Sequence, residues 1–190
     1  MNATKTLMEE HEVILQVLDS LELELSKIKE GKSNPTFFLD AADFIKGFAD
    51  GCHHAKEEGV LFKYMEDAGI PAQNGPIAVM LSDHEQGRLF TRQMREAAIK
   101  WQSGDQSAIT DVLENANGYI QLLRGHIFKE NNILFPMADR VIPVGEHQEL
   151  QRRHRALDRH LGDVDQEVAT VEAVQRVGQR QRAVGRVEAV

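Results

Sequence analysis

The chain of 190 residues contains a single cysteine, Cys52, and only 6% aromatic residues. One cysteine excludes an intramolecular disulfide framework and fits a reducing compartment. No segment approaches the roughly 20 consecutive apolar residues that a membrane-spanning helix needs, and the first 12 residues lack the apolar run of a signal peptide. We therefore expect a cytoplasmic protein with no membrane partner.

Positive charge is also scarce, because 22 basic residues stand against 30 acidic ones and leave a formal net charge of −8. Such a surface disfavours nucleic acid as a partner. The period-two alternation typical of β-strands is absent, and so is a glycine-rich phosphate loop. These absences favour a soluble all-helical protein without a nucleotide-binding motif.

Apolar residues recur at alternating spacings of three and four residues, which predicts amphipathic helices. His11 occupies a position in the first of these patterns that would otherwise be aliphatic. Glycine and proline separate the segments, and Pro136 and Pro143 end the last pattern. The expected helices cover residues 4–30, 36–68, 77–101 and 105–135. Four helices with short links predict an all-α, antiparallel up-down-up-down four-helix bundle built from two αα repeats.

A C-terminal helical extension follows the bundle, so we divide the chain into domains at residues 1–143 and 144–190. Residues 146–161 resemble a fifth, highly charged helix, with Leu150 and Leu157 spaced to dock onto the bundle. The composition of residues 162–190 is narrow and fits either a weakly packed helix or no fixed structure. Three histidines of the extension are expected to be solvated: His147, His154 and His160.

Six residues of metal-ligand type recur at one fixed offset of 73 residues. They are the pairs His11 and His84, His53 and His126, and Glu57 and Glu130. The flanking dipeptide Leu61-Phe62 recurs at the same offset. A repeat of this size indicates two copies of one supersecondary unit, whose equivalent positions meet in space. The sequence therefore predicts a metal centre at a pseudo-symmetric interface.

The number of ligands restricts the metal. Four imidazoles and two carboxylates are too many for one tetrahedral zinc and offer too few oxygens for calcium. They suit two first-row ions, each with two histidines, linked by both glutamates, and this mixture resembles non-haem iron sites. Manganese and zinc stay open. A zinc-protease HExxH motif is excluded, because Arg88 stands where its second histidine would be.

The register of the second helix leaves one alternative, since His54 and Glu58 are also four residues apart. The alignment of the two Leu-Phe dipeptides favours His53 and Glu57. His54 and Glu58 are then expected beside the ligands or at the surface. Cys52 is interpreted as a small core residue.

One histidine on each odd helix, with HxxxE followed by Leu-Phe on each even helix, resembles the hemerythrin-like (HHE cation-binding) family over about residues 7–140. The resemblance implies a left-handed four-helix bundle with a carboxylate-bridged di-iron centre, oxo- or hydroxo-bridged when oxidised. By this match Glu57 and Glu130 would be the bridges, and the terminal ligands would be His11, His53, His84 and His126. Oxygen-carrying members have a further histidine where Arg88 stands here. The resemblance therefore implies more open coordination, as in members implicated in nitric oxide, peroxide or iron-centre repair chemistry.

Three hypotheses of function follow. The first is a non-haem di-iron protein that binds or senses O2, NO or iron through the carboxylate-bridged centre. The second is a di-iron enzyme that reduces peroxide or nitric oxide, or protects or repairs iron–sulfur centres. Both imply a small diatomic or peroxide ligand. The third is a metal-free structural bundle with polar residues in its interior.

Overall fold

The computed structural model describes residues 4–160, and the expectation for residues 162–190 lies outside them. No strand occurs in this part of the chain, so the all-α prediction is confirmed there. None of its helices is long and apolar enough to cross a membrane. The α-helices are α1 (Lys5–Ile28), α2 (Pro35–Phe44), α3 (Phe62–Asp67), α4 (Pro76–Gln102), α5 (Ala108–Lys129), α6 (Phe135–Val141) and α7 (His147–His160).

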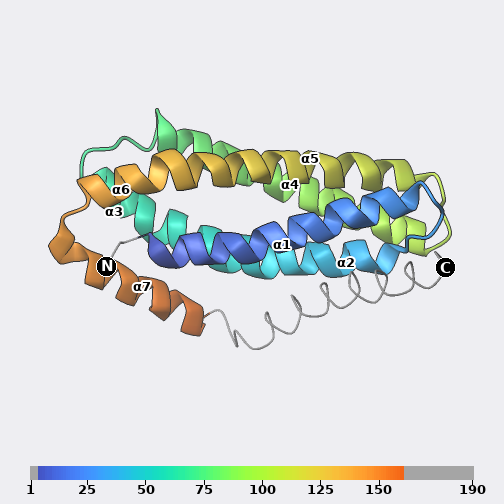
Figure 1. Ribbon diagram of the computed structural model, residues 1–190, viewed down its shortest axis with the longest axis horizontal. Coiled ribbons are helices and arrows are strands. Elements are labelled where there is room, and N and C mark those ends of the chain that lie inside the picture. Colours follow the sequence, from blue (N-terminus) through green and yellow to red (C-terminus); the bar gives the residue numbers. More distant parts are fainter. Residues whose placement is uncertain (1–3, 161–190) are drawn as a thin grey trace, which may run out of the picture.

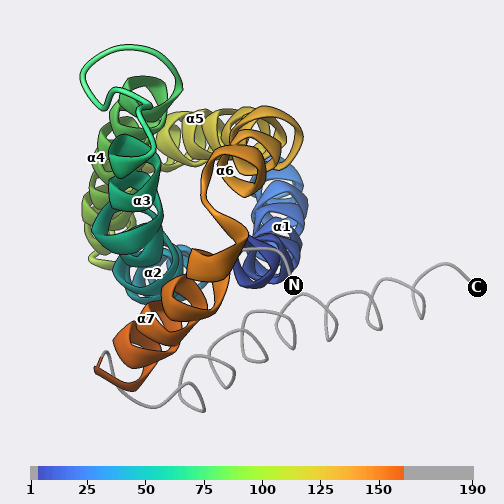
Figure 2. The ribbon, with the colours of Figure 1, turned by 90° about the vertical axis from the view of Figure 1, so that its left-hand side faces the viewer.

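The long helices lie side by side and form a helical bundle (Figure 1). Seen from one end, α1, α2, α4 and α5 surround a common axis, and α7 lies outside this arrangement (Figure 2). Asn34 begins α2, because its side-chain oxygen accepts a hydrogen bond of 2.7 Å from the backbone N–H of Thr36, and Pro35 supplies the fixed φ angle that suits a first turn.

Three π-helical segments interrupt the helices: η1 (Ile45–His54), η2 (Glu57–Leu61) and η3 (Glu130–Leu134). The sequence predicted uninterrupted α-helix over residues 36–68, and the structure differs by these wider turns. A π-turn inserts a residue into the α-helical pattern and changes the direction of the side chains that follow, and such turns are frequent at functional sites. All three segments contain residues that the sequence singled out as ligands or their neighbours.

The π-helical segment η3 comes just before Pro136, where the sequence pattern was expected to end, and the helix continues past this proline. Pro136 lies in the first turn of α6, directly after η3. A first-turn proline is tolerated because its missing N–H would have no α-helical partner there. The helical path therefore runs on to Val141.

Two separate clusters of buried apolar side chains hold the bundle together. One includes Leu21, Phe38 and Met94, and the other includes Leu61 and Ile77. Four long helical rods make up the bundle: α1, α2 with η1 to α3, α4, and α5 with η3 and α6. Along each rod, the candidate ligands lie between residues of the first cluster and residues of the second. The bundle thus contains a buried polar layer between two apolar layers, which shield the polar side chains from water.

Helix α7 packs against the η2 segment through Leu150 and Leu157, and Leu150 is fully buried. The expectation that its histidines are solvated is wrong for His147 and His154, whose exposed fractions are 6% and 1%. They lie on the face of α7 that packs on the bundle, as the spacing of Leu150 and His154 by four residues requires. Nothing is described for the side chain of His160.

His154 should make the protein less stable in acid. Both of its ring nitrogens are buried without a hydrogen-bond partner, and burial, helped by the charge of Lys56, lowers the pKa of His154 to about 4. An unfolded histidine titrates near 6.5, so between pH 6.5 and 4 the unfolded chain binds a proton that the folded protein does not. The free energy of unfolding therefore falls as the pH is lowered through this window.

We expect the free energy of unfolding of His154→Leu to fall less than that of the unsubstituted protein when the pH is lowered from roughly 7 to 4.5. The difference between the two proteins should grow by roughly 2 kcal/mol over this range, as measured by urea unfolding in the presence of a chelator. Gln148→Leu changes an exposed residue of the same helix and should leave the pH profile as it is. Parallel profiles for His154→Leu and the unsubstituted protein would contradict a buried, neutral His154.

Candidate metal centre

The structure brings all six predicted residues together inside the bundle. Each of the four histidines is at most 1% exposed, and Glu57 and Glu130 are fully buried. His11 comes from α1 and His84 from α4, while the other residues come from η1, η2, α5 and η3. Every long rod therefore contributes at least one ligand-type side chain to the same layer.

The four imidazoles form two pairs that face each other through Nε2. The Nε2 atoms of His11 and His53 are 3.0 Å apart, and those of His84 and His126 are 3.2 Å apart. The sequence placed one histidine of each repeat on an odd helix and one on an even helix. The pairs observed here join the two histidines within each repeat.

Each glutamate contacts one histidine from each pair. Oε1 of Glu57 lies 3.5 Å from Nε2 of His53, and its Oε2 lies 3.4 Å from Nε2 of His84. Oε2 of Glu130 lies 3.1 Å from Nε2 of His11 and 3.2 Å from Nε2 of His126. Both carboxylates therefore occupy the space between the two histidine pairs.

Outer oxygen atoms fix the orientation of every ring. Nδ1 of His53 is 2.9 Å from a carboxylate oxygen of Glu10, and Nδ1 of His84 is 2.7 Å from one of Glu58. The corresponding distances are 2.8 Å from His11 to the amide oxygen of Asn131 and 3.3 Å from His126 to Asp83. These oxygens only accept hydrogen bonds, so each Nδ1 carries the hydrogen and each Nε2 of a neutral ring presents its lone pair.

The interior is consequently rich in acceptors and poor in donors. When the four rings are neutral, four Nε2 lone pairs and four carboxylate oxygens converge, and none of these oxygens accepts a hydrogen bond of good geometry from the described residues. Buried acceptors that face one another without a donor are costly unless a cation lies among them. The donor set fits metal ions, since neutral imidazole Nε2 atoms and carboxylates are ligands of first-row metals.

Protons compete with metal ions for this cluster. Burial lowers the pKa of His126, but the carboxylate of Glu130 outweighs burial and helps to raise this pKa to about 10. Nearby glutamates likewise overcome burial at His11 and His84 and raise their pKa values. Burial would raise the pKa of Glu130, yet the adjacent imidazoles hold it well below its ordinary value. A metal ion that bound here would therefore displace protons from the cluster.

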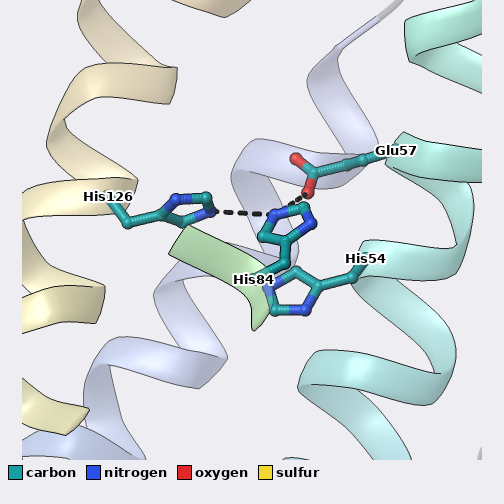
Figure 3. Close-up of side chains that lie close together, drawn as sticks. All are labelled: His54, Glu57, His84 and His126. Carbon is teal, nitrogen blue, oxygen red and sulfur yellow. Dashed lines mark hydrogen bonds and ion pairs between the residues drawn. The ribbon is translucent and has the colours of Figure 1, made fainter. Parts of the chain in front are cut away.

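His54 joins the centre, although the sequence placed it beside the ligands or at the surface. Its ring stacks on that of His84, with 3.8 Å between ring centroids, and its buried Nε2 has no hydrogen-bond partner (Figure 3). Ligand-type atoms of His54, Glu57, His84 and His126 all lie within 4.8 Å of one another. The same limit holds for the second group: His11, His53, Glu57 and Glu130.

The two histidines at positions 53 and 54 thus serve different halves of the cluster, at the end of π-helical segment η1. Glu58, by contrast, stays outside as the partner of His84, and its side chain is 31% exposed. Hydrogen bonds from His84 and from Arg88 lower the pKa of Glu58 to about 2. The structure therefore places Glu57 rather than Glu58 between the histidine pairs.

Arg88 occupies the position at which the resemblance noted above places a further histidine, and its charge is paired with carboxylates. Its guanidinium donates three hydrogen bonds of 2.7 Å, to Asp50, Glu58 and Glu85. Asp50 in turn lies 3.4 Å from Nδ1 of His54. Arg88 therefore anchors the acidic partners of two imidazoles, those of His54 and His84.

The outer partners obey the same 73-residue offset as the ligands, a signal that the sequence analysis did not use. Glu10 corresponds to Asp83, Glu58 to Asn131 and Lys56 to Lys129. Nζ of Lys129 lies 2.5 Å from Asp83, and Lys56 pairs with Glu10 in the same manner. The repeat thus contains the ligand-type residues together with the oxygens that orient them and the lysines. His54 is not repeated, because its counterpart 73 residues later is Ile127.

Cys52 lies next to this outer layer and is buried, as expected of a small core residue. Its Sγ is 3.2 Å from Nζ of Lys56, which also lies 2.5 Å from Asp158 on α7. Burial raises the pKa of the Cys52 thiol to about 12. The thiol therefore stays protonated and unreactive at neutral pH.

Comparisons with known proteins agree with this geometry. Relatives in Mycobacterium bovis and Mycobacterium tuberculosis, both named only as uncharacterized proteins, are 24% identical over 149 residues. The match covers 78% of this chain and 58% of each relative, so the chain spans a little over half the length of the relatives it matches. The family model of the hemerythrin HHE cation binding domain matches residues 2–138. The chain, with its buried His/Glu cluster, belongs to the hemerythrin HHE cation-binding family.

Proposed function

We propose that this protein holds two non-haem iron ions in an antiparallel up-down-up-down four-helix bundle and binds or senses O2, NO or iron in the cytoplasm. The observation that carries the proposal is the inward orientation of the imidazole lone pairs around two buried carboxylates. Glu57 and Glu130 would bridge the ions, with His11 and His53 on one ion and His84 and His126 on the other. The two irons would supply reversible binding of a diatomic ligand at an open coordination position.

The roles of the chain's own residues follow from their positions. The outer carboxylates and Asn131 hold each ring by its Nδ1 hydrogen and raise the basicity of the inward nitrogen. The apolar layers above and below the cluster keep bulk water away from it. Phe135 stacks on the ring of His11 with 5.3 Å between centroids and so restricts its movement.

A second candidate is an enzyme that reduces peroxide or nitric oxide, or protects iron–sulfur centres. The observation that favours it is a cavity of about 300 Å³ that is lined by His54 and by exposed residues such as Lys46 and Arg92. Such a cavity would give a substrate access to the neighbourhood of the centre. A stable oxygenated species on exposure to air favours the binding protein, and repeated turnover with peroxide or NO favours the enzyme.

Metal content tests the assignment directly. Protein purified without oxygen should contain about two irons per chain by elemental analysis and should gain visible absorption bands on exposure to air. His126→Ala should lose iron and unfold more readily, because the buried Glu130 then keeps only one of its two histidine partners, His11. His154→Leu, a change to a buried histidine outside the cluster, should keep both irons. A His126→Ala protein with two irons would refute the assignment of these ligands.

The outer carboxylates should control metal affinity. Glu10→Gln weakens the acceptor that holds His53, and we expect metal affinity to fall roughly 10- to 100-fold in competition with a chelator. Glu9→Gln is the matched control, because Glu9 is exposed and its one ion pair within residues 4–160 is with Lys5, across one helical turn. Equal affinities for the two variants would show that Glu10 does not act on the centre.

We further propose that His54 is a ligand of the ion held by His84 and His126, where it takes the place of the histidine that Arg88 replaces. His54→Ala should leave one tight Co²⁺ equivalent and weaken the second roughly 10- to 100-fold, as followed by cobalt d–d absorption. Two equal tight equivalents and unchanged cobalt spectra would place His54 outside the coordination sphere. Such a result would leave the six other ligands intact.

A further inference from the structure

A cavity of about 300 Å³ lies between the α2–η1 rod and α4, next to the His/Glu cluster. One water molecule takes up roughly 30 Å³ in the liquid, so a diatomic molecule needs only a small fraction of this space. Pockets that hold organic ligands begin at roughly this size. The volume therefore leaves room for a ligand larger than O2, NO or hydrogen peroxide.

The inner wall of the cavity is buried and offers one unused hydrogen-bond donor. It includes the apolar side chains of Ala42 and Ile45 and the backbone of Gly87, and the hydroxyl of Thr91 is already bonded to the Gly87 carbonyl at 2.9 Å. Tyr119 also lines this wall, is 1% exposed, and has a hydroxyl without a hydrogen-bond partner. Burial raises the pKa of Tyr119, so its hydroxyl stays protonated and can donate.

The rim of the cavity has the opposite charge to the chain as a whole. Four basic residues line the cavity with one acid, Asp50, in a protein of net charge −8: Lys46, Arg88, Arg92 and Arg95. Arg88 is fully engaged by carboxylates, and Arg95 pairs with Asp43 at 3.2 Å. Lys46 and Arg92 are exposed and form no ion pair within residues 4–160. The unneutralised charge at the rim favours an anion.

We infer that this cavity binds a small organic carboxylate, with its charge at the Lys46–Arg92 rim, an apolar body against Ala42 and Ile45, and a polar oxygen that accepts a hydrogen bond from Tyr119. The three parts of the ligand match three separate features of the wall. A donor such as Tyr119 is costly when buried unpaired, and a ligand oxygen removes that cost.

The cavity shares His54 with the metal centre, so a bound carboxylate would rest against a residue of the centre. An effect of this ligand on bound metal rests on the proposed function. The binding itself does not, because none of the three features that recognise the ligand belongs to the His/Glu cluster. The two ideas can therefore fail separately.

The test uses 6-oxoheptanoate, which combines a carboxylate, a methylene chain and a ketone oxygen, with the full-length protein freed of metal at pH 7. Calorimetric titration should show one site per chain. The uncharged 6-oxoheptanamide should bind roughly fivefold more weakly or worse, because it lacks the charge recognised at the rim. Heptanoate, which lacks the ketone, should bind roughly three- to tenfold more weakly.

Two variants probe the two ends of the cavity without disturbing the fold. Tyr119→Phe removes only the unpaired hydroxyl and should weaken 6-oxoheptanoate roughly three- to tenfold while leaving heptanoate unchanged. The double variant Lys46→Gln, Arg92→Gln should weaken both acids roughly fivefold. The matched control is Lys29→Gln, Lys63→Gln, which removes the same charge from exposed residues that do not line the cavity.

The outcomes separate the cavity from the metal centre. Equal affinities for the keto acid and its amide, or no loss in either cavity variant, would overturn the inference, as would no saturable binding at millimolar concentrations. Specific binding by a protein that takes up no iron would keep the cavity and remove the proposed function. A protein that contains two irons but does not bind the keto acid specifically would keep the proposed function and overturn the inference about the cavity.

Discussion

The structure depends on how a buried layer of hydrogen-bond acceptors is held in place. Each imidazole of the centre is fixed from outside by an oxygen at Nδ1, so its Nε2 lone pair turns toward two buried carboxylates. Such a layer needs cations, either protons or metal ions, to be compatible with a folded protein. Burial of the two apolar clusters that enclose the layer stabilises the fold and offsets the free-energy cost of burying these polar groups.

Pseudo-symmetry accounts for most of the centre. In both halves, a carboxylate that is paired with a lysine contacts Nδ1 of the histidine on the even helix, His53 or His126. A second oxygen contacts Nδ1 of the histidine on the odd helix, His11 or His84. The symmetry is broken on one side by His54, Asp50 and Arg88, whose repeat counterparts Ile127, Leu123 and Leu15 are all apolar. One half of the centre therefore has a third imidazole and borders the cavity, while the other half has two. The asymmetry gives the two halves different sets of ligand-type side chains within one fold.

Helix α7 is tied to the outer layer as well as to the apolar core. Asp158 pairs with Lys56, the lysine that also holds Glu10, and Glu10 orients His53. Leu150 secures the same helix in the second apolar cluster. The extension therefore covers the outer partners of one histidine, and the position of α7 bears on the centre although none of its described side chains belongs to it.

The sequence by itself determined that the described part of the chain is helical and which six ligand-type residues meet, because amphipathic spacing and a repeat of 73 residues are recorded in the order of residues. The same repeat contained the outer partners, such as Glu10 and Asp83. Only the tertiary structure decided the inward place of His54, since that depends on π-helical turns and on Asp50 and Arg88 from two different rods. It also decided the burial of His154, because a polar side chain on a charged helix is buried only when another surface covers it.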